Sequence, residues 1–482
     1  MYTLKGRYTS AFITVDNLEE QCIAQIHRFI NHVAFDQPVA IMPDAHAGKN
    51  SCVGFVMPLG SRILPSTVGV DLSCGMLSMN IGKKLNITHE VLDDLIRTHV
   101  PMGFNVHESK SRPGNMDKFS FSKQFPWNKV NDTLNKFFYE YNNKFGTSYV
   151  VPVIDYRSFV DKFKKYPKMD IKRVGAAVGS LGGGNHFIEV SKSESCGDIW
   201  ITIHSGSRNF GKVVCEYHEN VAKNKLDSKR NVTLRERIEN ITQNTTDRTQ
   251  IARLIKEAKK ELGLDSDVDL RGMEYLEGED LKEYLIDMVI AHIYASFNRE
   301  HMMDIISEIL GGVKGGERIE SVHNYIDFRD FTIRKGAIRS YVGEKMIIPF
   351  NMRDGILLCE GKSNPEWNFS APHGAGRVMS RSKAKVTIDM DKFRRQMKGI
   401  FSTSVCKGTL DEAPDAYKDA ALIEEAIEPT ATIIDRLLPI HNLKDKNSGF
   451  SFKERREAKK KDKERKVERD AKNFKRMKPK YQ

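Results

Sequence analysis

The 482-residue sequence has no long apolar run, no secretory start and few cysteines. No stretch approaches the roughly 18 apolar residues of a membrane span. Residues 1–7 lack the basic start, apolar run and small-residue cleavage site of a signal peptide. The seven cysteines are odd in number and have no repeated spacing, so they do not predict a disulfide framework. These absences predict a cytoplasmic protein that does not bind membranes.

Most of the chain has little net positive charge, although the total net charge is +12. Residues 451–482 hold 15 Lys and Arg against 6 Asp and Glu, a net charge of +9. The preceding 450 residues therefore carry only +3. This basic tail is either a solvated, partly helical segment or a contact for a phosphate backbone.

The length alone would allow two to four domains, but no clear linker precedes the tail. We therefore expect one body, residues 1–450, followed by the tail, residues 451–482. Apolar spacing predicts helices at 16–34 (capped by Asp16), near 130–143, in 230–265 as one or two surface helices, at 279–310 as an amphipathic helix, and at 417–437. Strands are expected at 39–42, 53–57, 199–204, 331–334 and 346–350, and at both ends of 171–190 around a glycine-rich turn.

Two side chains that can ligate a metal stand three residues apart in Val68-Gly-Val-Asp-Leu-Ser-Cys-Gly75. Asp71 and Cys74 would repel each other as anions unless a cation lay between them. Alone, the pair is more typical of a surface Asp beside an inert buried Cys. A divalent metal is the alternative that further ligands would favour.

Further candidate ligands are four histidines set among small or polar residues: His186, His204, His323 and His373. Imidazole, thiolate and carboxylate together suit a transition ion, with zinc or manganese as the plausible choices. Asp44 and His46, in the loop after strand 39–42, are candidates for direct ligands or for groups that orient a ligand.

At this point the motifs resemble those of the RtcB family of RNA ligases, which join a 3′-phosphate or 2′,3′-cyclic phosphate end to a 5′-hydroxyl end. The similarity runs from Met42 to Lys444. The motifs that carry it are Pro43-Asp-Ala-His-Ala-Gly48, Val68-Gly-Val-Asp-Leu-Ser-Cys-Gly75, Gly182-Gly-Gly-Asn-His-Phe187, His204-Ser-Gly-Ser-Arg208, Tyr275-Leu-Glu-Gly278, His323-Asn324, His373-Gly-Ala-Gly-Arg377 and Asp411-Glu-Ala-Pro414.

The resemblance implies an α+β fold, with sheets around a polar central cleft and helices outside. It implies two manganese ions that share Cys74, with Asp71 and His186 completing one site and His204 and His323 the other. It also implies that 105–165 and 215–270 are variable insertions in the catalytic body. A monomer is expected, and an activating protein partner is left open.

The resemblance further implies that His373 takes GMP from GTP, that Arg208 contacts an RNA phosphate, and that Asp44 lies in an outer shell. The implied nucleotide pocket consists of Asn185, His186, Glu189, His323, Asn324, Pro349, Asn351, Met352, His373, Gly374, Ala375, Gly376 and Lys444.

The chain departs from the family pattern in two places. Pro349-Phe-Asn-Met-Arg-Asp354 replaces the usual Pro-Gly-Ser-Met-Gly segment, and Asn442-Leu-Lys-Asp445 replaces the usual Cys-Val-Lys-Gly end. These changes leave the choice of nucleotide and RNA end open and indicate a divergent branch. Two other functions remain as alternatives: a metal-dependent cyclic phosphoesterase that does not ligate, and an RNA-binding protein with a structural zinc.

Overall fold

The computed structural model describes residues 1–447 apart from 109–110, 246, 262–271 and 314. One sheet has the order β1-β2-β3-β4-β12-β11, with β2 and β3 parallel and the other neighbours antiparallel. Its strands are β1 (Tyr2–Lys5), β2 (Ser10–Ile13), β3 (Val39–His46), β4 (Val53–Pro58), β12 (Thr332–Lys335) and β11 (Tyr325–Asp327).

A second sheet has the antiparallel order β10-β6-β8-β7-β17-β15-β14. Its strands are β10 (Arg318–Val322), β6 (Gly75–Gly82), β8 (Ile199–Ser205), β7 (Phe187–Ser193), β17 (Ala431–Leu443), β15 (Ile356–Gly361) and β14 (Lys345–Pro349). The backbone N–H of Ile347 in β14 donates to the hydroxyl of Ser321 in β10 at 2.9 Å. The two edge strands therefore meet, and the sheet is almost closed into a barrel.

Two short pairs connect these sheets to the rest of the body: β13 (Ala337–Arg339) with β16 (Ser370–Pro372), and β5 (Arg62–Ile63) with β9 (Leu276–Glu277). The α-helices are α1 (Glu20–Ile30), α2 (His89–His99), α3 (Phe121–Gln124), α4 (Trp127–Phe145), α5 (Tyr156–Phe163), α6 (Ile171–Ala177), α7 (Arg208–Asn244), α8 (Arg248–Glu261), α9 (Gly278–Ile309), α10 (Arg381–Thr387), α11 (Met390–Gln396) and α12 (Ala420–Ala426). Short 3₁₀ turns are η1 (Pro65–Thr67), η2 (Gly114–Lys118), η3 (Pro365–Trp367), η4 (Lys407–Glu412) and η5 (Pro414–Ala416).

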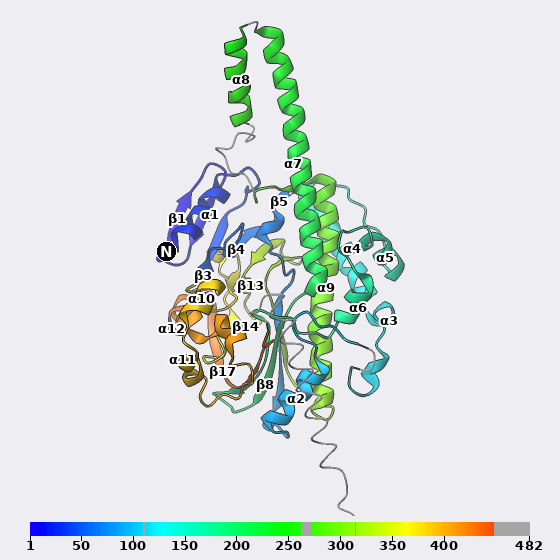
Figure 1. The fold of residues 1–482 in the computed structure, drawn as a ribbon, viewed down its shortest axis with the longest axis vertical. Helices are drawn as coiled ribbons and strands as arrows, with labels where there is room; N and C mark the ends of the chain where they lie inside the picture. Colours follow the sequence, from blue (N-terminus) through cyan, green and yellow to red (C-terminus); the bar gives the residue numbers. More distant parts are fainter. Residues whose placement is uncertain (109–110, 246, 262–271, 314, 448–482) are drawn as a thin grey trace, which may run out of the picture.

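Helix α9 joins the cores of the two sheets. Its first half, including Leu285 and Tyr294, packs with α1, α4, α7 and the six-stranded sheet. Its second half, including Met302 and Ile306, packs with β6, β7, β8 and α2. Each such fully buried side chain contributes about 1.5 to 3 kcal/mol to folding. Figure 1 shows α9 beside the sheets, with α3–α6 on its outer side and α10–α12 across the molecule.

The expected α+β class is confirmed, but α9 is neither an outer helix nor an amphipathic one. Between Tyr284 and Arg299 only His292 and Phe297 are partly exposed. A helix that is covered on all sides needs apolar residues around its whole circumference, which weakens the one-sided pattern that the prediction assumed.

Two elements were predicted with the wrong structure. Residues 171–177 form helix α6 rather than a strand, because the Asp170 side chain accepts from the backbone N–H of Arg173 and caps the first turn. The helix expected at 417–437 is only α12, and β17 begins at Ala431. Pro429 interrupts the helical pattern, and the β-branched residues that follow it favour the strand that pairs with β7 and β15.

The cap predicted at Asp16 is also wrong. Helix α1 begins at Glu20 without a side-chain cap. The Asp16 carboxylate instead accepts from the N-terminal amine of Met1 at 2.6 Å. Helix α4 and strands β4, β8, β12 and β14 confirm the corresponding predictions, as do α7 and α8 within 230–261.

Within the described residues, no helix combines the length and apolarity needed to cross a bilayer. All seven cysteines are free, as their spacing predicted. The basic tail at 451–482, including the helical structure expected there, lies outside the described residues.

Candidate active site

Five side chains that can ligate a metal lie together where four neighbouring strands of the seven-stranded sheet begin or end. We call them the ligand cluster: Asp71, Cys74, His186, His204 and His323. Cys74 directly precedes β6, His186 precedes β7, His204 is next to last in β8, and His323 follows β10. These four strands are neighbours in the order β10-β6-β8-β7. Adjacent antiparallel strands run in opposite directions, so each begins beside the point where its neighbour ends. Four segments that are distant in sequence therefore meet at this end of the four strands.

The distances within the ligand cluster suit shared ions. The Nε2 atom of His186 lies 2.9 Å from Oδ2 of Asp71 and 3.3 Å from Sγ of Cys74. The Nε2 atom of His204 lies 3.2 Å from the same sulfur and 3.2 Å from Nε2 of His323. Atoms that each lie about 2.0 to 2.3 Å from one ion are separated by roughly 3 to 3.7 Å. The cluster thus offers two three-ligand groups, and Cys74 belongs to both.

The imidazoles of the ligand cluster are in the form that binds metals. The Nδ1 atom of His186 is 2.8 Å from the carbonyl oxygen of Leu181, which can only accept, so the Nε2 lone pair faces the cluster. Burial lowers the pKa of His204 and of His323 well below the usual range. Neighbouring imidazoles add to the effect, and both rings are therefore neutral.

The protonation of the Cys74 thiol and the Asp71 carboxylate indicates that a cation would suit the ligand cluster. Burial, and then the charge of Asp71, raises the pKa of the Cys74 thiol far above its usual value. Burial opposes ionisation of Asp71, yet His186 and Arg208 together hold the pKa of this partly exposed carboxyl below its ordinary value. The Oδ1 atom of Asp71 makes no hydrogen bond among the described residues. A divalent ion would neutralise both groups, so the donor set fits one.

Glycines let the backbone approach the ligand cluster. A Cβ at Gly206 would lie 2.4 Å from Oδ1 of Asp71, and one at Gly182 would lie 2.4 Å from Nδ1 of His186. Gly182 also has a φ of +99°, which side chains disfavour. Any larger residue at either position would displace a candidate ligand.

Two buried polar residues of α9 tie the cluster's loops together. The Arg299 guanidinium donates to the carbonyl oxygens of Ser73 and Ser205, at 2.9 and 2.8 Å. The Asn298 side chain accepts from the backbone N–H of Gly179 at 2.8 Å and donates to the carbonyl of Gly206 at 3.2 Å. Sequence reasoning assigned these residues no role. A polar pair in the middle of an apolar helix was the signal that could have found them.

A cavity of about 410 Å³ opens beside the ligand cluster. His204 and His323 form part of its wall, so it reaches one of the two ligand groups. The other residues predicted for a nucleotide pocket that line this cavity are Asn185, Glu189, Asn324, Pro349, Asn351, Met352, His373, Gly374, Ala375, Gly376 and Lys444. His186 lies behind this wall and lines a second cavity instead.

His373 stands between the cavity and the ligand cluster. It directly follows β16, and its ring centroid is 4.7 Å from that of His323. Its Nδ1 atom lies 2.7 Å from Oδ2 of Asp44, which is fully buried in β3. Neither carboxylate oxygen of Asp44 makes a hydrogen bond of standard geometry among the described residues. The contact with the His373 imidazole is the ion-pair distance recorded for this carboxylate. Gly376 has a φ of +71°, and a Cβ there would lie 2.3 Å from the Asp44 carbonyl oxygen, so the turn packs on β3.

A buried carboxyl lies in the wall of the cavity. Glu189 accepts from the hydroxyl of Ser191 and from the side-chain amide of Asn442, both at 2.8 Å. Burial raises its pKa to about 7, although both donors and Lys444 act in the opposite direction. This carboxyl can therefore accept or donate a hydrogen bond near neutral pH.

Lys444 lies close to Glu189 and is held by Glu412. Its ammonium donates to the Asn185 carbonyl at 3.1 Å and to the Glu412 carboxylate at 3.0 Å. Arg381 and Tyr417 also contact Glu412. Sequence reasoning quoted the segment containing Glu412 as a motif but did not predict this group.

A family model described as "RtcB: tRNA-splicing ligase RtcB" matches residues 25–445. The chain belongs to the RtcB family. Among curated relatives, the RNA-splicing ligase RtcB of Escherichia coli (strain K12) is 27% identical over 415 residues, covering 82% of this chain and 87% of the relative. The tRNA-splicing ligase RtcB of Aeropyrum pernix is 25% identical over 461 residues, covering 83% and 86%. That of Archaeoglobus fulgidus is 22% identical over 491 residues, covering 88% and 91%. Such low identities fit a divergent branch.

The segments that depart from the RtcB pattern both border the cavity. Residues 349–354 form the turn between β14 and β15, where the Asn351 amide donates to Asp354 at 2.7 Å. Lys444 follows β17, and its backbone N–H donates to the Ser404 hydroxyl at 2.8 Å. Among the changed residues, Asn351 and Asn442 line the cavity.

A second cavity, of about 420 Å³, reaches the ligand cluster from the side of Asp71 and His186. Arg208 lines it at the start of α7. The guanidinium donates to the Gly103 carbonyl at 2.6 Å and to the Ser180 hydroxyl at 3.1 Å. Arg208 therefore lies beside the ligand group that contains Asp71 and His186, in a cavity that His373 does not line. Its contact with RNA stays a prediction.

Proposed function

We propose that the protein joins RNA ends that carry a 2′,3′-cyclic phosphate or 3′-phosphate to ends that carry a 5′-hydroxyl, using GTP and two manganese ions. Membership in the RtcB family supports RNA ligation. One observation supports the mechanism most strongly: the imidazole of His373 lines the nucleotide-sized cavity, lies tilted against the ring of His323 and has its Nδ1 atom 2.7 Å from buried Asp44.

The first step would use His373 as a nucleophile. Asp44, 2.7 Å from Nδ1, would hold a proton on that atom and leave the Nε2 lone pair free to attack the α-phosphorus of GTP. A nitrogen–phosphorus bond forms, the bond to the β-phosphate breaks, and pyrophosphate leaves. The small residues after His373 let the nucleotide approach the backbone.

The ligand cluster would hold the ions. Asp71 and His186 would bind one, His204 and His323 the other, and Cys74 both. Bound ions would neutralise charge on the phosphoryl oxygens and keep the reacting oxygens aligned. Cys74 would have to lose its proton on binding, because the thiolate is the ligand.

The second and third steps would activate and join the RNA. The RNA 3′-phosphate, either present at the start or formed when water opens the cyclic phosphate by breaking its bond to the 2′-oxygen, would take GMP from His373, which regenerates the imidazole and forms an RNA 3′-GMP anhydride. A 5′-hydroxyl would then attack the RNA phosphorus and release GMP. Arg208 in the second cavity would hold an RNA phosphate, and Glu189, Asn324 and Lys444 would hold the guanosine side.

Radiolabelled GTP tests the function directly. The protein is incubated with α-labelled GTP and manganese, and then with two RNA strands carrying the proposed ends. We expect a protein-bound GMP that is labile in acid and stable in base, followed by a joined RNA. Hydrolysis of the cyclic phosphate without labelling or joining would indicate the phosphoesterase. RNA binding without either reaction would indicate the binding protein.

A further inference from the structure

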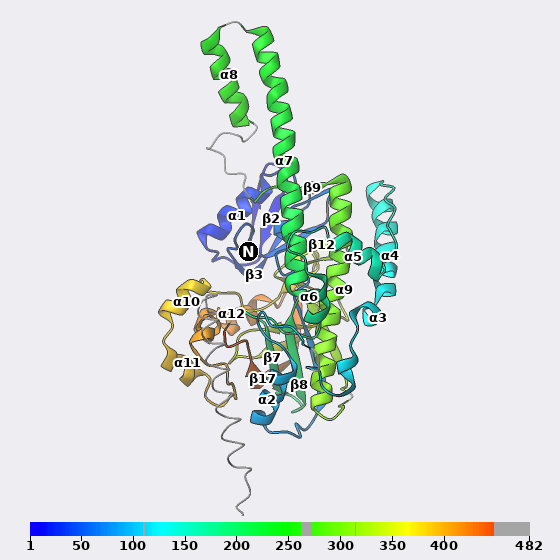
Figure 2. The ribbon, with the colours of Figure 1, turned by 45° about the vertical axis from the view of Figure 1, so that its right-hand side comes forward.

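Helix α7 leaves the body partway along its length. Up to Ala222 it alternates buried and exposed residues, and Phe210, Val214 and Cys215 are fully buried. Among the described side chains of α7 beyond Ala222, none is buried. Figures 1 and 2 both show the distal part of α7 and all of α8 projecting from the body side by side. We call this projecting pair, residues 223–261, the hairpin.

The hairpin is held together by its own contacts. The residues of α8 that are at most partly exposed, Ile251, Leu254, Ile255 and Ala258, recur at helical spacing and form the face toward α7. Arg237 of α7 pairs with Glu261 of α8. The hairpin is thus a two-helix unit in which most of the other described side chains are exposed to solvent.

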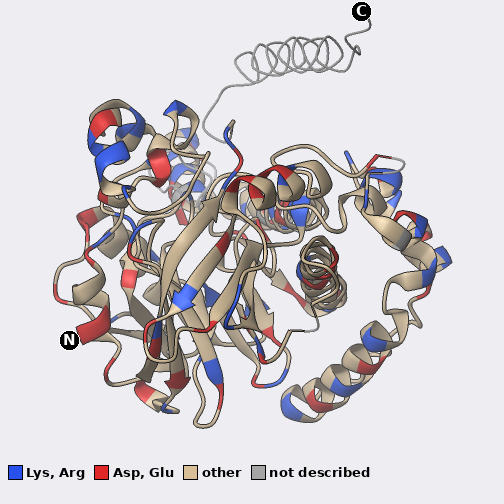
Figure 3. Cartoon of the chain, turned by 90° about the horizontal axis from the view of Figure 1, so that it is seen from below, with Lys and Arg blue, Asp and Glu red and all other residues tan. Residues whose placement is uncertain are grey.

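The hairpin is the basic part of the catalytic body. Residues 223–261 contain eleven Lys and Arg against six Asp and Glu, a net charge of +5. Because the tail carries +9 of the total of +12, all other residues together carry −2. Figure 3 shows acidic and basic residues interspersed along the helices and strands of the body. The positive charge outside the tail is therefore concentrated in this hairpin.

Three exposed basic residues of α8 form a stripe. At about 100° per residue, Arg248, Lys256 and Lys259 fall within an arc of about 80° and extend over about 16 Å. Glu257 lies outside this arc and pairs with Arg253. The stripe thus presents cations without an acidic residue among them, which suits an anionic polymer.

We infer that the hairpin is an RNA-binding arm, and that the stripe of α8 contacts the phosphate backbone of the substrate away from the ends being joined. This rests on the proposed function. Arg208 starts α7 in the second cavity, and Arg237, which is level with the end of α8, lies 29 residues further along the helix. That separation is about 44 Å. An RNA with its end at the ligand cluster needs roughly 13 stacked nucleotides to reach the stripe.

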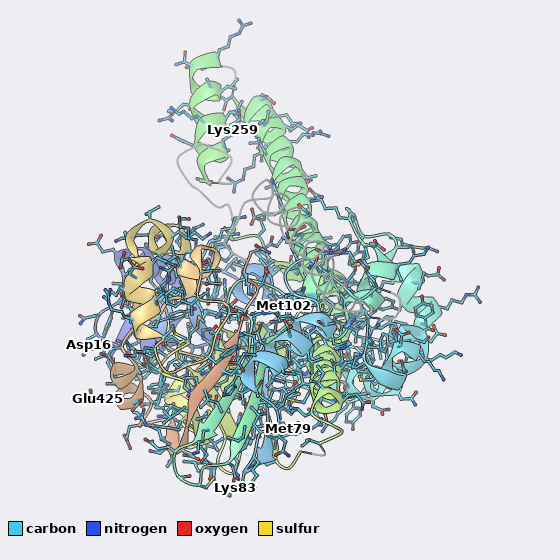
Figure 4. The ribbon with its side chains drawn as sticks, turned by 60° about the horizontal axis from the view of Figure 1, so that its bottom comes forward. Asp16, Met79, Lys83, Met102, Lys259 and Glu425 are labelled. Carbon is cyan, nitrogen blue, oxygen red and sulfur yellow. The ribbon has the colours of Figure 1, made fainter. Side chains whose placement is uncertain are left out.

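A matched pair of double variants tests the arm in the full-length protein, with the tail intact. The stripe variant is Lys256→Gln with Lys259→Gln. The control is Lys83→Gln with Lys84→Gln, which removes the same charge at the opposite end of the molecule from Lys259 (Figure 4). Both variants should keep wild-type GMP labelling, which reports an intact body.

We expect the stripe variant to bind a 40-nucleotide RNA about threefold to tenfold more weakly than wild type. The slope of log affinity against log salt should flatten by roughly 1.4, at about 0.7 for each lost single-strand contact. Affinity for a six-nucleotide RNA should not change, because that RNA cannot reach the stripe. A second variant, Lys256→Arg with Lys259→Arg, keeps the charge and should bind the long RNA as wild type does.

Three results would contradict the proposed RNA-binding role of the hairpin. They are unchanged binding of the long RNA by the stripe variant, an equal loss of affinity for the short RNA, and an equal loss of affinity in the control variant. Unchanged binding would leave the hairpin as a surface for another class of partner. If wild type neither labels with GTP nor joins RNA ends, the proposed function fails instead. The two failures are therefore distinguishable.

Discussion

The base of α7 and its distal part belong to one helix but are stabilised by different kinds of contact. At the base, Phe210 packs against Phe159, Phe163 and Tyr294, and Arg208 lies beside the ligand cluster. In the hairpin, buried or partly exposed apolar residues of α8 face α7, and most of the other described side chains are exposed, many of them charged. The base depends on contacts with many distant segments, whereas the hairpin depends on local pairing. Substitutions at the base should therefore abolish chemistry or folding, and those in the hairpin should only tune binding.

The largest effect should come from Cys74→Ala, next to the base of α7. Because the thiol belongs to both ligand groups, the variant should lose both ions, and ligation should fall by more than about a thousandfold. Asp71→Ala should lose one ion and less activity. Elemental analysis measures the metal content. A Cys74→Ala protein with its full complement of metal would show that the thiol does not bridge.

His373→Ala separates chemistry from metal binding at the same site. The variant should lose GMP labelling and the joining of 3′-phosphate ends while it keeps its metals. It should still join an RNA whose 3′-phosphate already carries GMP, since that step needs no nucleophile from the protein. The readouts are label on the protein and joined RNA on a gel. Wild-type ligation without an adduct on His373 would contradict the proposed mechanism.

Stability should differ sharply between the two ends of α7. Phe210→Ala removes a fully buried ring and should lower the free energy of unfolding by about 3 to 5 kcal/mol. Ile238→Ala, at a partly exposed position of the hairpin, should lower it by under about 1 kcal/mol. Denaturant titration followed by circular dichroism measures both. Equal losses would mean that the hairpin is as much part of the core as the base.

The smallest of the four effects concerns Glu189 and pH. Its pKa is about 7 in the folded protein because of burial, against about 4.5 when exposed, so the folded state binds the extra proton between these values. That stabilisation is complete below about pH 4.5 and is lost as the pH rises through 7, a change of about 3 kcal/mol. Glu189→Gln should flatten the unfolding free energy over this range. Parallel pH profiles for the variant and wild type would exclude the raised pKa.

Sequence patterns predicted the cluster residues better than they predicted the surrounding structure. Asp71 and Cys74 are local, and the histidines stand among small or polar residues; the resemblance selected the five ligands from these candidates, and the structure brings all five together. Their metal and the role of each remain predictions. Asp44 lies against His373 rather than against the ligand cluster, a distinction that residue spacing does not carry.

The two wrong predictions of secondary structure have one local and one tertiary cause. Residues 171–177 and 431–443 carry short mixed patterns, and a cap at Asp170 and pairing with two neighbouring strands determine their form. Arg299 and Glu412 escaped notice because their partners are carbonyls and cations from distant segments. The sequence can mark such residues as unusual, but their partners become visible only when the chain is folded.

The continuity of α7 makes it a lever. Its base packs next to the ligand cluster, and Arg237 in the hairpin lies about 44 Å away along the same helix. A tilt of about 5° at the base would move the helix at Arg237 by roughly 4 Å, which is less than the rise of one helical turn. A change too small to disturb the packing around Phe210 is thereby magnified at the tip. The same rigidity works in reverse, so a load on the hairpin is delivered as torque to the residues that begin the helix.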